Sequence, residues 1–208
     1  MTSHFLLTGL IIGFAIAAPV GPIGVLCIRR TLAHGRTVGL LSGLGAATAD
    51  AFYGCVAGFG LTAISTLLLN QQFWLALGGG IFLCYLGFKT LRLPATNLST
   101  QTHRQSYLNA YASTFFLTIT NPATILSFAA IFAGLGLAGT AGDYIAAAVL
   151  VMGVFAGSAL WWLALSTGVS LLTRRLNSGF MPWINRISGV IILGFGVVIL
   201  LNLAVTAT

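Results

Sequence analysis

Residues 5–30 read FLLTGLIIGFAIAAPVGPIGVLCIRR. The stretch stays apolar from Phe5 to Ile28, and a helix that crosses a bilayer needs about 20 such residues. It therefore predicts a transmembrane helix that ends at Arg29 and Arg30. Pro19 and Pro22 lie inside it, and a proline removes an amide donor and clashes with the preceding turn. The first span is thus predicted to be broken.

Similar apolar runs fill the rest of the chain. Of the 208 residues, 58% are hydrophobic and 5% are charged, whereas soluble domains carry about 25% charged residues. Five further spans are predicted, at 38–69, 73–93, 107–133, 144–172 and 182–203. The sequence therefore predicts an all-α integral membrane protein with six transmembrane helices, and it leaves little chain for a soluble enzyme domain.

The basic residues all fall on one side of this six-span arrangement. They are Arg29, Arg30, Arg36, Lys89, Arg92, Arg104, Arg174, Arg175 and Arg186. Lys and Arg concentrate in cytoplasmic loops, so both termini are expected on the outer side of a cytoplasmic membrane. The net charge of +7 is explained by these loops, and nucleic-acid binding is not expected.

A second break is predicted in the fourth span, where Asn121 and Pro122 interrupt the run. It matches the first break in position, which indicates two three-helix repeats, 1–93 and 107–208, joined by a cytoplasmic linker at 94–106. The stretches that begin at Gly45 and Gly153 share a weak pattern of glycine, polar residue and aromatic residue. Since each half has three spans, the repeats are inverted. Paired broken helices in inverted repeats are typical of secondary transporters with a midplane site.

Asp50 is the residue that most strongly indicates function. It lies about twelve residues into the second span, roughly 18 Å along the helix. An acid at that depth costs about 2.5–3.5 kcal/mol and is usually functional. Burial favours the neutral form of a carboxyl group, so Asp50 is suited to bind an ammonium group or to carry a proton. The alternative is an acid that only hydrogen-bonds a neighbouring helix.

The breaks supply the opposite polarity. A half-helix that begins after a proline presents free amides and a partial positive charge, which suit a carboxylate. Together with Asp50, such ends would match an amino-acid zwitterion; the alternative is a structural kink. The predicted site residues are Asp50, Pro19, Gly21, Pro22, Gly24, Thr48, Asn121, Pro122 and Ser158. For Thr48, Asn121 and Ser158, a hydrogen bond to a neighbouring helix is an equally good reading.

Cofactor and enzyme motifs are missing from the sequence. The three cysteines have no CxxC spacing, and no HExxH, nucleotide-binding loop or Ser-His-Asp order is present. No cofactor, metal site or enzymatic activity is predicted.

Several motifs resemble the lysine-exporter (LysE-type) family of amino-acid efflux carriers. The matching residues are Pro19-Val20-Gly21-Pro22, Gly35-Arg36, Gly43-Leu44-Gly45, Asp50 and Asn121-Pro122. The resemblance implies proton-driven export of amino acids from a bacterial cytoplasm, with no cofactor, by a homodimer. Where family members commonly carry a basic residue after Asn-Pro, this chain has Ala123-Thr124. The alternatives are a carrier of divalent metals or other cations, for which the chain lacks a ligand cluster, a channel and a non-transporting membrane scaffold.

Overall fold

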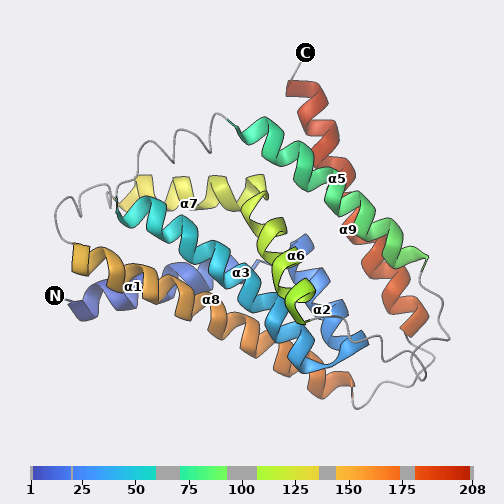
Figure 1. The fold of residues 1–208 in the computed structure, drawn as a ribbon, viewed down its shortest axis with the longest axis horizontal. Coiled ribbons are helices and arrows are strands. Elements are labelled where there is room, and N and C mark those ends of the chain that lie inside the picture. Colours follow the sequence, from blue (N-terminus) through green and yellow to red (C-terminus); the bar gives the residue numbers. More distant parts are fainter. Residues whose placement is uncertain are drawn as a thin grey trace.

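The computed structural model describes residues 2–19, 21–59, 71–92, 107–135, 144–173 and 181–206, which contain eight α-helices and no strand (Figure 1). The helices are α1 (Thr2–Ala17), α2 (Pro22–His34), α3 (Arg36–Gly58), α5 (Gln72–Leu91), α6 (Tyr107–Ile119), α7 (Pro122–Leu135), α8 (Tyr144–Thr173) and α9 (Met181–Thr206). The predicted linker 94–106 lies outside the described residues.

Three of these helices are long and apolar enough to cross a membrane, with spans at Gln72–Leu91, Tyr144–Leu172 and Pro182–Val205. Helices α1 and α2, which are bent by 80° at the predicted break, pass the same test only as a pair, and they make a fourth span if the pair is counted as one span. Helix α3 is less apolar because it carries Ser42, Thr48 and Asp50, and α6 and α7 are each too short alone. The structure is that of an all-α membrane protein; the count of six spans stays a prediction.

Both predicted breaks are present as interruptions between helices. Helix α1 ends at Ala17 and α2 begins at Pro22; α6 ends at Ile119 and α7 begins at Pro122. At each break a proline occupies the first helical position, where its missing amide would be unpaired in any case. The prolines therefore start new half-helices in addition to ending the preceding ones.

The position of Arg29 and Arg30 differs from the prediction. The sequence places them in a loop, but α2 continues to His34 and both side chains are buried within the fold. The first span is therefore longer than its apolar run, because polar side chains of neighbouring helices receive the two guanidinium groups.

Helix α1 packs along α8 through glycines on both helices. A Cβ atom added at Gly13 would collide with the backbone of Val154, and one at Gly157 would collide with the backbone of Leu10. Gly9 and Gly153 are equally crowded by the opposite backbone. The two glycine pairs, each spaced by four residues, let the helix backbones touch, as small residues do in membrane helix pairs.

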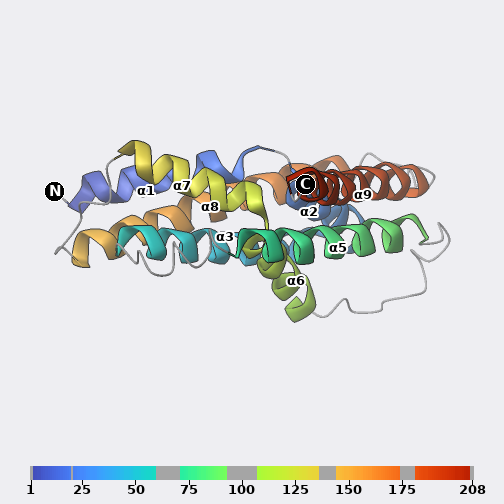
Figure 2. The same cartoon turned by 90° about the horizontal axis from the view of Figure 1, so that it is seen from above.

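The remaining helices pack around α3 or form a second pair. Helix α3 contacts α8, α6 and α2, whereas α5 packs along α9 at one end of the molecule (Figure 1). Figure 2 shows α3 and α5 in one layer and α1, α7 and α9 in the other. This arrangement brings both helix breaks next to α3, which carries Asp50.

Candidate functional site

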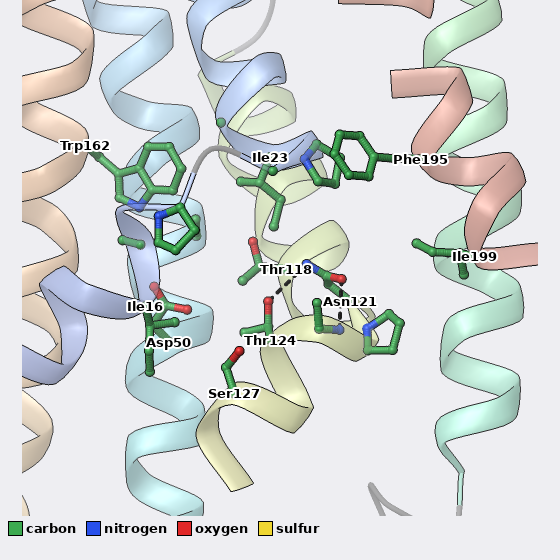
Figure 3. Close-up of a pocket in the computed structure, with 18 residues that line it drawn as sticks. Ile16, Ile23, Asp50, Thr118, Asn121, Thr124, Ser127, Trp162, Phe195 and Ile199 are labelled. Atoms are coloured by element: carbon green, nitrogen blue, oxygen red, sulfur yellow. Dashed lines mark hydrogen bonds between the residues drawn. The ribbon is translucent and has the colours of Figure 1, made fainter. Parts of the chain in front are cut away.

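A cavity of about 340 Å³ lies between the two helix breaks. It is lined by Ile16, Ala17, Pro19, Gly21, Pro22, Ile23, Gly24, Ala46, Asp50, Thr118, Asn121, Pro122, Ala123, Thr124, Ser127, Trp162, Phe195 and Ile199. In Figure 3, Asp50 and Trp162 lie on one wall, and Phe195 and Ile199 lie on the opposite wall. The volume is near the lower limit of small-molecule sites, roughly 300–1,000 Å³, so the cavity suits a small ligand.

Asp50 supplies the negative end of this cavity. Its side chain is 3% exposed, and its Oδ2 accepts a hydrogen bond of 2.7 Å from the Ser158 hydroxyl on α8. Ser158 Oγ in turn accepts a hydrogen bond of 3.2 Å from the indole Nε1 of Trp162. A chain of donors thus orients the carboxylate, and hydrogen bonds in such chains polarise one another.

The first helix break supplies an open helix N-terminus. Gly21 is the N-cap of α2 and makes no side-chain cap, and its carbonyl accepts the first helical bond, 3.0 Å from the Val25 amide. The amides of Ile23 and Gly24 belong to the first turn, whose N–H groups have no partner inside a helix. Both residues line the cavity, so this positive helix end lies at the cavity wall.

The second helix break is closed by its own side chain. Asn121 Oδ1 accepts a hydrogen bond of 3.2 Å from the Ala123 amide, and Asn121 Nδ2 donates to Thr124 Oγ1 at 3.1 Å (Figure 3). Asn is a preferred N-cap residue because its side-chain oxygen takes a free first-turn amide. The sequence predicts an anion site at both half-helix ends, but the structure leaves only the α2 end uncapped by a side chain.

Tyr53 holds the end of α6 at this break. In an unbroken helix the Ile119 carbonyl would accept from the Ala123 amide, which here donates to Asn121. The Tyr53 hydroxyl on α3 donates to the Ile119 carbonyl instead, at 2.5 Å. The carbonyl released by the break therefore keeps a partner, as a buried backbone group requires.

Replacing Tyr53 by Phe should destabilise the fold. The variant leaves the Ile119 carbonyl without this donor, and an unsatisfied buried acceptor costs about 1–3 kcal/mol. We expect a lower midpoint of thermal unfolding for purified protein in detergent. Tyr107→Phe is the control, because Tyr107 is 58% exposed. Equal midpoints for the two variants would contradict this role for Tyr53.

The structure gathers most of the predicted site residues around one cavity. Asp50, Pro19, Gly21, Pro22, Gly24, Asn121 and Pro122 line it. Ser158 contacts it indirectly, through Asp50. Thr48 does not line the cavity: its hydroxyl donates to the Leu44 carbonyl and accepts from the Tyr111 hydroxyl at 2.8 Å. For Thr48, the alternative reading of a bond between helices matches the geometry.

Other lining residues were not assigned to the site from the sequence. Thr118 and Thr124 each lie three residues from Asn121 and carry hydroxyl groups into the lining. Thr118 lies on α6 just before the Asn-Pro break and Thr124 lies on α7 just after it, so their closeness to the break in the sequence was the signal that could have found them. Trp162 follows Ser158 by one helical turn on α8, yet nothing in the sequence separates it from Trp161, which is absent from the lining.

No metal centre was found in the described ranges. No group of three or more His, Cys, Asp or Glu side chains there could hold a metal ion. Cys27, Cys55 and Cys84 are free thiols. Within this part of the chain, the chemistry of the cavity is that of one carboxylate, several hydroxyl groups and a helix N-terminus.

Comparison with known proteins gives one family and two bacterial relatives at 29% and 31% identity. The family model for LysE type translocators matches residues 14–203. A putative amino acid efflux protein of Bacillus subtilis (strain 168), YcgF, is 29% identical over 197 residues, covering 93% of each chain. An uncharacterized membrane protein of Escherichia coli (strain K12), YahN, is 31% identical over 172 residues, or 79% of this chain and 75% of that protein. No solved structure matches the chain.

Proposed function

Because the chain belongs to the family of LysE type translocators, we propose that it is a secondary active exporter of amino acids, driven by the proton gradient. Membership of this family identifies the chain as a membrane transporter. Its relative from Bacillus subtilis is described as a putative amino acid efflux protein, which supports amino acids as the cargo. The cavity between the helix breaks is the proposed binding site.

The single observation that carries this proposal is the pairing of Asp50 with the open end of α2. Asp50 and the first turn of α2 line the same small cavity. A carboxylate suits the ammonium group of an amino acid, and a helix N-terminus with free amides suits its carboxylate. The two polar ends of the zwitterion then have complementary partners, and Ile16, Ile23 and Phe195 offer apolar surface to its side chain.

Coupling to protons is assigned to Asp50. A buried carboxylate is costly unless it is paired or protonated. In the proposed cycle, Asp50 binds the cargo ammonium while the cavity is open to the cytoplasm. It binds a proton after the cargo has left, while the cavity is open to the outside. The Ser158 hydroxyl stabilises the ionised form, since it donates to Oδ2. One proton would enter for each cargo molecule that leaves.

Helix contacts support two inverted repeats, 1–93 and 107–208, as the moving parts. In the proposed repeat, α6 corresponds to α1, and α8 corresponds to α3. Helix α1 of the first half packs on α8 of the second, and α6 of the second half packs on α3 of the first. Helices α3 and α8 contact each other, as do α5 and α9. Such exchanged contacts are what a two-fold relation between the halves produces. Rocking of one half against the other would then expose the cavity to each side in turn.

The proposed orientation places the basic helix ends in the cytoplasm of a bacterium. Arg36 begins α3, Lys89 and Arg92 lie at the end of α5, and Arg186 lies in the first turns of α9; all four are exposed. These residues lie on the cytoplasmic side under the positive-inside rule. Both termini are then outside, and the protein is expected to work as a homodimer in the cytoplasmic membrane.

Transport by purified protein in proteoliposomes tests the proposal. Vesicles are loaded with labelled amino acids, and efflux is followed with and without an imposed pH gradient. Saturable efflux of at least one amino acid that increases with the gradient is the expected result. If folded, inserted protein moves none of them, amino-acid export is refuted; if efflux ignores the gradient, only the coupling is refuted.

The role of the α2 end predicts a specific effect of Gly21→Val. A Cβ added at Gly21 meets no atom within 4 Å, and its φ of −98° is open to any residue, so the fold should tolerate the change. The valine would project beside the first-turn amides and block the cargo carboxylate. Since hydrogen bonds to charged groups contribute about 1.5–3 kcal/mol, efflux at limiting cargo should fall by roughly tenfold or more.

The control for this variant is Gly168→Val, at a glycine on α8 that also has open space around it. Gly168 is not among the residues that line the cavity. The control should transport normally. Normal transport by Gly21→Val as well would remove α2 from the binding site.

A further inference from the structure

Arg30 is buried beside the cavity without an acidic partner in the described part of the chain. Its side chain is 4% exposed. The whole sequence contains two acids; one of them, Asp50, is engaged with Ser158. Burying a guanidinium group is costly unless its donors are satisfied. The acceptors that satisfy Arg30 therefore identify the helices that it joins.

Those partners come from two other helices. Arg30 Nη1 shares its two hydrogens among three acceptors, the Ser42 hydroxyl of α3 at 2.9 Å and the Thr114 hydroxyl and Ala110 carbonyl of α6 at 2.7 and 2.8 Å. Its Nη2 donates to the Ser113 hydroxyl of α6 at 2.7 Å. One side chain of α2 therefore ties α3, in the same proposed half, to α6, in the other half.

Each hydroxyl group around Arg30 already donates its single hydrogen to a backbone carbonyl. Ser42 donates to the Val38 carbonyl, Ser113 to the Asn109 carbonyl and Thr114 to the Ala110 carbonyl, each on its own helix. They therefore act toward Arg30 only as acceptors. Neutral acceptors bind a guanidinium less strongly than a carboxylate does, so this contact can open without separating a buried ion pair.

The acceptors of Arg30 on α3 and α6 lie one helical turn from the cavity. On α3, Ser42 precedes the lining residue Ala46 by four residues; on α6, Thr114 precedes the lining residue Thr118 by four. Four residues correspond to about one turn of roughly 5.4 Å. In both helices the Arg30 partner lies on the side of the basic helix ends, which the proposed function places in the cytoplasm.

We propose that Arg30 is the cytoplasmic gate of the transport path, closing the cavity by joining α2 to α3 and α6. Opening toward the cytoplasm requires the contacts of Arg30 with α6 to break, so that the proposed halves can separate there. Cargo would then reach Asp50 from the cytoplasm. The inference rests on the proposed function for its direction, but its test needs no cargo.

Solvent access to the cavity tests the gate. A single cysteine is placed at the lining residue by Ala46→Cys, after Cys27, Cys55 and Cys84 are replaced by Ala. A membrane-impermeant thiol reagent is then applied to inside-out vesicles and, separately, to right-side-out vesicles. Arg30→Met keeps much of the side-chain length but removes all the donors. It should raise the labelling rate from the cytoplasmic face by roughly tenfold or more, because several hydrogen bonds to a charged group are lost.

Two further variants keep the test decisive. Thr114→Val has nearly the same shape but loses one acceptor, and should raise labelling less than Arg30→Met; it replaces that variant if the latter fails to insert. Arg36→Met removes an exposed guanidinium at the start of α3 and should leave labelling unchanged. The gate would be overturned if Arg30→Met and Thr114→Val both showed the same rate of cytoplasmic labelling as the Arg36→Met control. Raised labelling in protein that moves no amino acid would keep the gate and refute the proposed cargo.

Discussion

Asp50→Asn should abolish gradient-driven efflux while the protein remains folded. The asparagine has nearly the same shape, and its side-chain oxygen can still accept the hydrogen bond from Ser158. It can neither carry a proton nor offer a charge to an ammonium group. Removing one partner of a buried ion pair costs about 3–5 kcal/mol, so we expect efflux at limiting cargo to fall by about 100-fold or more. Proteoliposome efflux under an imposed pH gradient measures this loss.

The matched control for Asp50→Asn is Ser158→Ala. This variant keeps the carboxylate but removes the hydroxyl that donates to it and accepts from Trp162. It should therefore lower efflux much less than Asp50→Asn and retain its dependence on the pH gradient. Gradient-driven efflux by Asp50→Asn at the wild-type rate would show that Asp50 has no part in coupling.

Gly157→Ala should have the largest effect on folding. The added methyl group would collide with the backbone of Leu10 and force α1 away from α8. Overpacking usually costs about 1–3 kcal/mol, and a backbone neighbour cannot turn aside as a side chain can. We therefore expect a loss near or above the upper end of that range and a fall in the midpoint of thermal unfolding of roughly 5–10 °C.

Gly168→Ala is the same substitution on the same helix, where the added methyl group meets no atom within 4 Å. Alanine inside a helix is more stable than glycine by about 0.5–1 kcal/mol. This control should therefore unfold at the wild-type midpoint or slightly above it. Melting of both variants in detergent, followed by size-exclusion chromatography, gives the comparison. A Gly157→Ala protein as stable as Gly168→Ala would mean that α1 and α8 are not in backbone contact.

Local features of the site were predictable because they depend on residues close together in the chain. Pro22 and Pro122 mark the starts of two half-helices whatever surrounds them, since proline cannot continue a helix from the preceding turn. Asn121 is a preferred N-cap residue, and the sequence therefore also contained the signal that α7 closes its own end. The prediction of an anion site at both half-helix ends does not include this capping.

Other features needed contacts between distant residues. Arg30 was predicted to lie in a loop with its neighbours because runs of basic residues usually do, and its acceptors on α6 lie 80 to 84 residues away. Thr48 and Ser158 had the same prediction, a polar residue near mid-membrane. Only packing separated them: Ser158 faces Asp50, and Thr48 faces Tyr111.

The sequence alone determined that this protein is helical, that it belongs in a membrane and where its helices break, and it predicts Asp50 as the functional acid. These properties follow from apolar run length, from proline chemistry and from the cost of a charge in a bilayer, all of which act locally. The tertiary structure decided which helix end stays open to a ligand, which polar groups face the cavity and what surrounds Arg30. Those depend on which helix faces which, and a helix pattern specifies the face to be buried without naming the partner that buries it.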